Sequence, residues 1–347
     1  MIFVNEKENG KDECASSTIQ STMTSADYYF DSYSHFGIHE EMLKDEVRTK
    51  SYMKAIELNR HLFRDKTVLD VGAGLGILSM FAARAGAKKV YAVECSNIAD
   101  QCKLIIEANG YSGIIEVFKG KMEEITLPGE GVDIILSEWM GYFLLYESML
   151  DTVLYARDKY LKPNGMIFPD KAVLYISAIE DGDYKKEKIN FWENVYGFNM
   201  SVMKDIAYTE PLVDLVDSRA IVSNNQAILD IDILTCKKED LNFSTKFSLT
   251  FSRDDYCHAF VAYFECSFTQ IHKPIKFSTG PNAQPTHWKQ TVFYLNDELV
   301  VNKGETIEGT INCVQNTKNC RDLDITIDYA FDGENNAANN VQMYKLR

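Results

Sequence analysis

A glycine-rich loop between an apolar strand and a helix constrains the fold of this chain more than any other feature. Residues 68–76 read Val-Leu-Asp-Val-Gly-Ala-Gly-Leu-Gly, so the run Thr67–Val71 predicts a buried strand that leads into three closely spaced glycines. Helical spacing follows at once over Ile77–Ala85. Glycines at such a junction let the backbone approach a ligand that a Cβ atom would keep away. The segment therefore predicts a ligand site at the end of a strand.

Strands and helices alternate along the first half of the chain. Short apolar strands separated by helical segments are typical of βαβ units, in which a parallel sheet is buried on both faces. The further segments predicted from this pattern are a helix from Met42 to about Leu62, strands at Lys89–Glu94, Ile114–Phe118, Asp133–Ser137 and Met166–Phe168, a helix at Asn97–Asn109 and a turn at Lys162–Gly165.

The pattern changes after about Pro169. Apolar residues alternate with polar ones over Leu323–Phe331, and Phe247–Phe251 and Thr306–Val314 show the same period of two. Because period two indicates half-buried antiparallel strands, the second half of the chain is predicted to be mostly β.

These patterns divide the chain into a first domain at residues 25–170 and a second at residues 171–347. Residues 1–24 are polar and aperiodic, which predicts a disordered leader, and the Asn-rich end from Asn335 to Arg347 is expected to fray. Residues 183–215 are partly helical in spacing and rich in aromatic side chains. This stretch either joins the second core or forms an arm that buries itself on another subunit.

The chain of 347 residues is strongly acidic, with a formal net charge of −15 at pH 7. Nucleic acid binding depends on neutralising phosphates, so direct nucleic acid binding is not expected, whereas a cationic partner is favoured. No apolar run approaches the ~18 residues of a membrane-spanning helix, so no membrane partner is expected. The eight cysteines show no zinc-site spacing, which predicts reduced thiols and no metal.

The glycine spacing favours S-adenosylmethionine as the ligand. It is G-x-G-x-G, whereas dinucleotide binders have G-x-G-x-x-G, in which the third glycine lets the helix pack closely on the strand. Glu94 ends the next strand, where an acid can hold both ribose hydroxyls. Since NAD also carries ribose, Glu94 does not separate the two cofactors. NAD binding and a purely structural turn are therefore the alternatives.

Two acids, Glu138 and Glu147, follow the fourth predicted strand in an otherwise apolar segment. Ligands of open parallel sheets bind outside the carboxyl ends of the strands, so this loop should overhang the cofactor. Carboxylates in apolar surroundings are costly unless a positive group pairs with them. A turn at Gly141 would bring the two acids face to face as a clamp for a flat, bidentate cation such as guanidinium. The alternative is that both acids are helix caps or solvated surface residues.

Five segments in this order resemble the type I protein arginine N-methyltransferases over about residues 25–330. These segments are Tyr29-Phe30-Asp31-Ser32-Tyr33, residues 39–49 (His-Glu-Glu-Met-Leu-Lys-Asp-Glu-Val-Arg-Thr), the glycine loop, the double-acid loop at residues 137–150 and Thr286-His287-Trp288.

The resemblance implies a Rossmann-like S-adenosylmethionine domain, then a mostly antiparallel β-barrel domain with an inserted helical dimerisation arm. It implies transfer of methyl groups to arginine in proteins, giving monomethyl and then asymmetric dimethylarginine, with S-adenosylhomocysteine as the product. The expected partners are Arg/Gly-rich proteins, basic histone-type tails and a second copy of the chain, or a higher oligomer. The expected location is cytoplasmic and nuclear.

The resemblance also assigns roles to individual residues. Arg48 would pair with the carboxylate of the cofactor's methionine moiety, and Glu123 would lie near its adenine. The residues matched to cofactor binding are His39, Arg48, Asp70, Gly72, Gly74, Glu94, Met122 and Glu123. Those matched to catalysis are Glu138, Glu147, His287 and Asp45, and those matched to the substrate pocket are Tyr33, Met42 and Trp288.

The chain departs from the family pattern at Leu75, where Thr is frequent, and at Met122, where Val is common. Both changes concern packing on the adenine side. Two other functions compete with the enzyme. One is a catalytically silent scaffold for Arg-rich tails, which the intact acids and glycines oppose. The other is a methyltransferase of another substrate class, which the acidity and the lack of an Asn/Asp-Pro-Pro-aromatic loop oppose.

Overall fold

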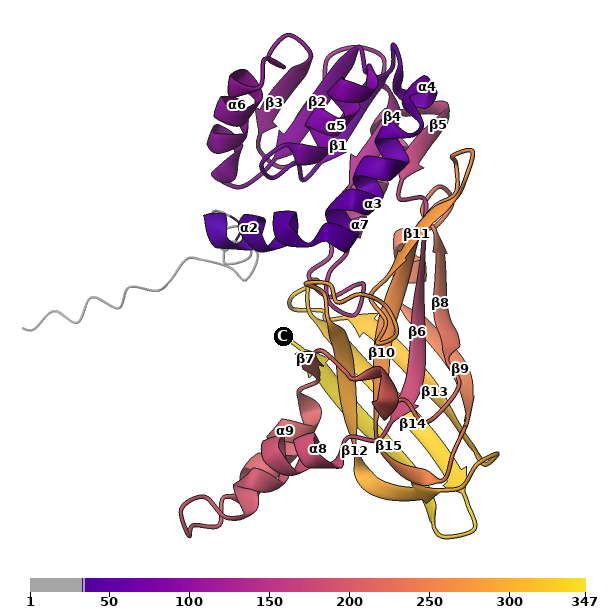
Figure 1. The fold of residues 1–347 in the computed structure, drawn as a ribbon. Coiled ribbons are helices and arrows are strands. Elements are labelled where there is room, and N and C mark those ends of the chain that lie inside the picture. The colour runs from indigo at the N-terminus through magenta and orange to yellow at the C-terminus, as the bar shows by residue number, and fades with distance from the viewer. Residues whose placement is uncertain (1–32, 34) are drawn as a thin grey trace, which may run out of the picture.

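The computed structural model describes residue 33 and residues 35–347, and it consists of two stacked domains (Figure 1). In the first, a parallel sheet has the strand order β3-β2-β1-β4-β5. Val68 of β1 pairs with Val90 on one side and with Ile134 on the other. The bounds are β1 Thr67–Val71, α5 Ile77–Ala85, β2 Lys89–Glu94, α6 Ile98–Ala108, β3 Ile115–Lys119, β4 Val132–Ser137, α7 Leu150–Tyr160 and β5 Leu161–Phe168. The predicted Rossmann-like sheet is confirmed.

The helices before β1 differ from the prediction. One helix was expected from Met42 to about Leu62, but the chain forms α2 at Phe36–Lys44, α3 at Glu46–Glu57 and α4 at Arg60–Phe63. The first break lies at Asp45, whose backbone is extended and whose Oδ1 accepts a 3.0 Å hydrogen bond from the N–H of Arg48. The break arises because an Asp that caps the next helix has left helical geometry itself.

The second domain contains two antiparallel sheets whose edge strands adjoin. One has the order β7-β12-β10-β6-β8 with β11 beside β10, and the other has the order β15-β14-β13-β9. The bounds are β6 Lys171–Ile179, β7 Leu212–Asp214, β8 Gln226–Asp232, β9 Phe243–Thr250, β10 Asp255–Phe268, β11 Ile275–Ser278, β12 Gln290–Val301, β13 Thr306–Gln315, β14 Leu323–Asp332 and β15 Ala337–Leu346. The predicted antiparallel class of this domain is confirmed.

Two local predictions were wrong. The end of the chain does not fray: β15 pairs with β14 along its whole length, from Ala337 opposite Asp332 to Leu346 opposite Leu323. Its alternation is hidden because one buried position is Gln342, whose amide is satisfied by three hydrogen bonds. The predicted turn at 162–165 is a bulge inside β5 rather than the end of an element.

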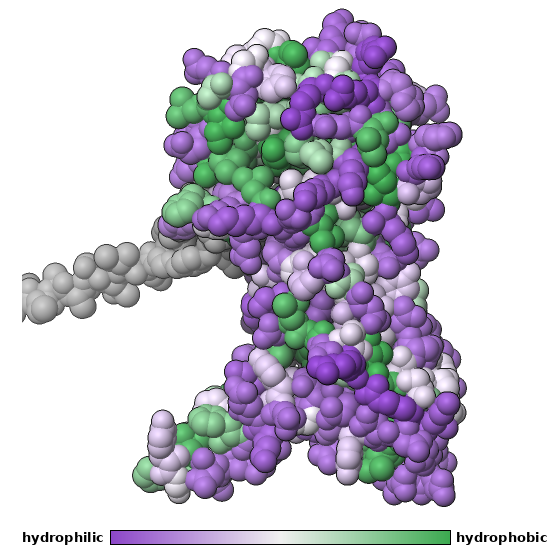
Figure 2. All heavy atoms as spheres, in the orientation of Figure 1, coloured by the Kyte–Doolittle hydropathy of each residue, from purple (hydrophilic) through white to green (hydrophobic). Residues whose placement is uncertain are grey.

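The segment between β6 and β7 projects from the second domain as an arm (Figure 1). It holds α8 Gly182–Lys188, the 3-10 turns η1 Asn190–Glu193 and η2 Ser201–Met203, and α9 Lys204–Thr209. Tyr196 is 97% exposed and Phe198 is 69% exposed. Figure 2 shows hydrophobic residues at the end of this arm. Residues 1–24, predicted to be a leader, lie outside the described residues.

In the described part of the chain, every helix is too short or too polar to span a bilayer.

Candidate active site

A cavity of about 440 Å³ lies at the carboxyl ends of β1, β2 and β4. The segment at residues 286–288 of the second domain also reaches its wall. The cavity brings together thirteen of the fifteen residues to which the sequence assigns site roles. These are Tyr33, His39, Met42, Arg48, Gly72, Gly74, Glu94, Met122, Glu123, Glu138, Glu147, His287 and Trp288.

The glycine loop forms the floor of one end of the cavity. Gly72 and Gly74 have φ angles of 73° and 55°, in the left-handed region that favours glycine. A Cβ atom on Gly72 would lie 2.5 Å from the Cε atom of Met149. A side chain there would therefore have to displace Met149, which also lines the cavity.

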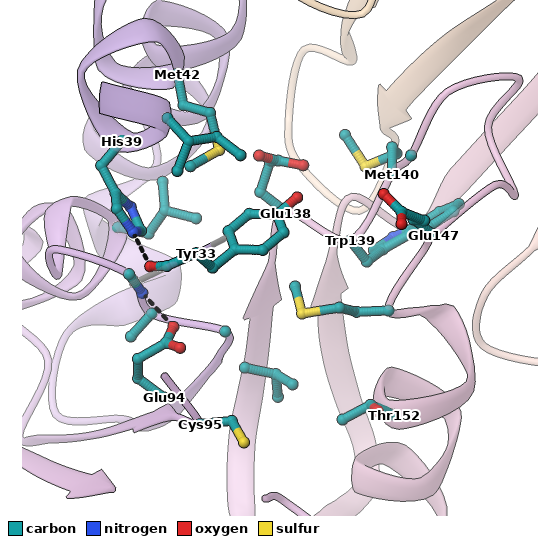
Figure 3. A pocket seen from close by; sticks show the side chains of 18 of the residues that line it. Tyr33, His39, Met42, Glu94, Cys95, Glu138, Trp139, Met140, Glu147 and Thr152 are labelled. Atoms are coloured by element: carbon teal, nitrogen blue, oxygen red, sulfur yellow. Dashed lines mark hydrogen bonds between the residues drawn. The ribbon is translucent and has the colours of Figure 1, made fainter. Parts of the chain in front are cut away.

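Glu94 ends β2 beside this loop. Its Oε2 accepts a 2.9 Å hydrogen bond from the N–H of Gly74, and its Oε1 accepts a 2.8 Å hydrogen bond from the N–H of Ser96. Figure 3 shows the carboxylate directed toward the loop. These bonds fix the carboxylate and leave each oxygen a further lone pair, as an acceptor of ribose hydroxyls requires.

Asp70 does not line the cavity, contrary to its assignment as a cofactor contact. It is fully buried beneath the loop, and its Oδ2 accepts a 2.6 Å hydrogen bond from the Ser79 hydroxyl. Burial raises the pKa of Asp70 to about 6. Because Ser79 belongs to α5, this bond places the Asp70 side chain in the packed layer between the sheet and that helix.

Glu138 is held by Arg48. The Nε atom of Arg48 donates a 2.8 Å hydrogen bond to Oε2 of Glu138, and both side chains are 8% exposed. Another nitrogen of Arg48, Nη1, donates to the carbonyl oxygen of Met42. The sequence placed Arg48 with the cofactor and Glu138 with the substrate, and it did not anticipate this pair.

Glu147 lies on the far side of a tight loop. Gly141 opens the turn, donating a 3.0 Å hydrogen bond to the carbonyl oxygen of Leu144, and the loop closes where Met149 donates to the carbonyl oxygen of Trp139. Burial raises the pKa of Glu147, and the positive charge of Arg321 partly offsets this rise. Figure 3 shows Glu138 and Glu147 on the wall of one cavity.

His287 reaches the cavity from the second domain. Its Nδ1 atom lies 2.7 Å from Oδ2 of Asp45, which also accepts a 2.9 Å hydrogen bond from the His287 N–H. Burial by itself would raise the pKa of Asp45, but the hydrogen bonds from His287 and Arg48 bring it below its ordinary value. Asp45 itself does not line the cavity, so it can act only through His287. Next to this pair, Trp288 donates a 3.0 Å hydrogen bond to the carbonyl oxygen of Met140.

The remaining assigned residues line the two ends of the cavity. Met122 is buried, and Glu123 accepts a 3.0 Å hydrogen bond from the Thr152 hydroxyl. His39 bonds through Nε2 to the carbonyl oxygen of Tyr33 at 2.8 Å (Figure 3). Met42 lies on the wall near Arg48.

Several cavity residues carried no assignment. They are scattered in the sequence, and no local pattern distinguishes them from packed or surface residues. The main ones are Cys95, Tyr142, Tyr146, Met149, Thr152, Cys320 and Arg321. Among the described residues, no group of three or more His, Cys, Asp or Glu side chains is arranged to hold a metal ion.

Comparison with known proteins gives a consistent result. Residues 170–334 match the family described as the arginine methyltransferase oligomerization subdomain, and residues 48–157 match the ribosomal protein L11 methyltransferase family. The chain is 58% identical over 340 residues to protein arginine N-methyltransferase 1 of Chlamydomonas reinhardtii, covering 98% of this chain and 99% of that protein. It is 56% identical over 329 residues to the probable protein arginine N-methyltransferase 1.2 of Arabidopsis thaliana, covering 95% and 90%.

A solved structure is also similar. It is the Trypanosoma brucei PRMT1 enzyme-prozyme heterotetrameric complex with AdoHcy, with a TM-score of 0.89 and 47% identity. The likeness covers 91% of this chain and 100% of that one.

Proposed function

Because this chain belongs to the protein arginine N-methyltransferases and methylates arginine with S-adenosylmethionine as the donor, we propose that it is a type I enzyme. A type I enzyme places two methyl groups on the same terminal nitrogen of arginine. The resemblance of residues 39–49 and of the double-acid loop to type I enzymes supports this proposal.

The observation that carries the proposed mechanism is that Glu138 and Glu147 line the same cavity as the glycine loop and Glu94. A guanidinium group stays protonated because its pKa exceeds 12, and its five N–H donors match a pair of carboxylates. Two carboxylates that bind it concentrate positive charge on the nitrogens they contact, which leaves electron density on the attacking nitrogen. They also hold that nitrogen in line, and such positioning can supply a large part of a rate enhancement.

The cavity residues fit the donor. When bound, S-adenosylmethionine supplies a methyl group on a cationic sulfur. Glu94 offers fixed acceptors for ribose hydroxyls, and Arg48 offers a cation for the carboxylate of the methionine moiety while it holds Glu138. The left-handed glycines leave the loop backbone open to the ligand. Asp45 orients the His287 ring through the contact with Nδ1, so this pair is a proposed relay for the proton that arginine loses.

The acidic surface supports basic substrates, and the arm supports self-association. A net charge of −15 favours encounter with Arg/Gly-rich proteins and basic histone-type tails. Exposed aromatic residues at the end of an arm are typical of a surface that another subunit covers. The oligomerization subdomain match and the heterotetrameric trypanosome relative support a homodimer or a higher oligomer of this chain.

The product of the reaction tests the proposal. We expect incubation with S-adenosylmethionine and an Arg/Gly-rich peptide to give monomethylarginine first and asymmetric dimethylarginine later. Tandem mass spectrometry distinguishes these products, because asymmetric dimethylarginine loses dimethylamine and the symmetric isomer loses methylamine. Symmetric dimethylarginine, or arrest at the monomethyl stage, would contradict the type I assignment.

A further inference from the structure

The backbone of Glu147 has an uncommon conformation that the second domain supports. Its φ of 55° lies in the left-handed region, which a residue with a Cβ atom adopts at some cost. Its N–H donates a 3.0 Å hydrogen bond to the carbonyl oxygen of Arg321. Glu147 follows β4 of the parallel sheet, whereas Arg321 lies in the turn between β13 and β14. One half of the proposed clamp is therefore fixed from the other domain.

The turn that carries Arg321 is itself tightly bonded. Asn316 donates a 2.9 Å backbone hydrogen bond to the carbonyl oxygen of Asp322, and the Asn319 amide donates a 2.7 Å bond to Asp322 Oδ1. The N–H of Arg321 donates to the Asn319 side chain at 3.2 Å. Arg347, at the end of β15, forms an ion pair with Asp324 just beyond the turn. These bonds give the Arg321 carbonyl a defined position.

The charge of Arg321 also acts on Glu147. Both residues line the same cavity. Burial raises the pKa of Glu147, the charge of Arg321 lowers it and the charge of Asp322 raises it. The other titratable groups of this part of the wall are Tyr142 and Tyr146 on the same loop, Glu41 on α2, Cys320 on the turn, His287 and the Arg48–Glu138 pair.

We propose that Arg321 is a positioning residue for the arginine clamp, which fixes the Glu147 backbone through its carbonyl oxygen and favours the ionised carboxylate through the charge of its guanidinium. The inference rests on the proposed function of Glu147 and adds a residue from the second domain to it. The ionised form matters because a protonated carboxyl group cannot serve as a purely accepting partner for guanidinium N–H groups. Asp322, the next residue, acts on Glu147 in the opposite sense.

The test is the pH profile of kcat/KM with an Arg/Gly-rich peptide. Arg321→Met removes the charge and leaves the backbone carbonyl, so its acidic limb should move to higher pH by roughly half a unit or more. Arg321→Lys keeps the positive charge, so its acidic limb should lie close to that of the wild type. Asp322→Asn has nearly the same shape as the native residue and should move the limb to lower pH. Lys318→Met, an exposed cation of the same turn outside the cavity wall, is the matched control and should leave the profile unchanged.

The outcomes separate this inference from the proposed function. An inactive wild-type protein would overturn the proposed function, and an active wild type serves as the positive control. Acidic limbs that stay in place in Arg321→Met and Asp322→Asn would overturn the inference alone. A loss of activity that is equal at every pH and is not restored by Lys would show that Arg321 only packs the turn. If the melting curve shows that Arg321→Met does not fold, Asp322→Asn still tests whether neighbouring charges set the pKa of Glu147, with a shift expected in the opposite direction.

Discussion

Asp70 is a carboxyl group that the fold buries completely, although the sequence suggested a direct contact with the cofactor. Its pKa is raised to about 6, so the folded state binds a proton more tightly than the unfolded state does. A carboxyl group of this kind lowers the free energy of unfolding as pH rises from about 4 through 6, because ionisation is easier in the unfolded chain. Its place beneath the glycine loop suggests a structural contribution to the loop rather than ligand binding.

Substitution of Asp70 by Asn should therefore have a pH-dependent effect on stability. Relative to wild type, the free energy of unfolding of Asp70→Asn should increase as the pH rises from 4 to 7.5. A change of up to about 3 kcal/mol is expected, since each pKa unit corresponds to about 1.4 kcal/mol. Denaturant unfolding at both pH values measures it. Asp332→Asn, at an exposed site, is the control, and a difference that is independent of pH would contradict the account.

At the scale of elements, the apolar pattern predicted the parallel domain well. The predicted bounds Thr67–Val71, Ile77–Ala85 and Lys89–Glu94 agree with the structure, because buried strands and their covering helices need continuous or strictly periodic apolar residues. The break between α2 and α3 was missed, since Asp45 has helical spacing and its side chain is held by His287, which is distant in the sequence. The strand β15 was missed because polar Gln342 occupies a buried position that only contacts from other strands can satisfy.

The end of the arm carries aromatic side chains, Tyr196 and Phe198, that are largely exposed in the described chain. Replacing Tyr196 and Phe198 by Asp should convert the associated protein to monomers at micromolar concentration, because charged residues cannot be buried at low cost in an apolar interface. Light scattering gives the mass. The control replaces the exposed Val341 and Met343 of β15 by Asp. A wild-type monomer, or equal association of both variants, would show that the arm does not drive assembly.

At the scale of the whole molecule, the site depends on both domains. The parallel sheet supplies the glycine loop, Glu94 and Glu138, while the second domain supplies His287 and Arg321. The sequence predicted the motifs in the first group because each lies at the carboxyl end of a strand or directly after it. It could not predict the Arg48–Glu138 pair or the Glu147–Arg321 bond, since these join residues separated by 90 and 174 positions. Such contacts depend on how the layers pack rather than on any local pattern.

The central claim is that Glu138 and Glu147 bind the arginine guanidinium beside the methyl donor, and Glu147→Gln tests it most directly. This change removes one charge with little change in shape. We expect kcat/KM for an Arg/Gly-rich peptide to fall by roughly 100-fold or more, as for the loss of one charge-stabilising group in other active sites. Binding of S-adenosylmethionine, measured by calorimetry, should be retained. Glu130→Gln, an exposed acid outside the cavity wall, should match wild type in both measurements. Normal turnover by Glu147→Gln would contradict the account.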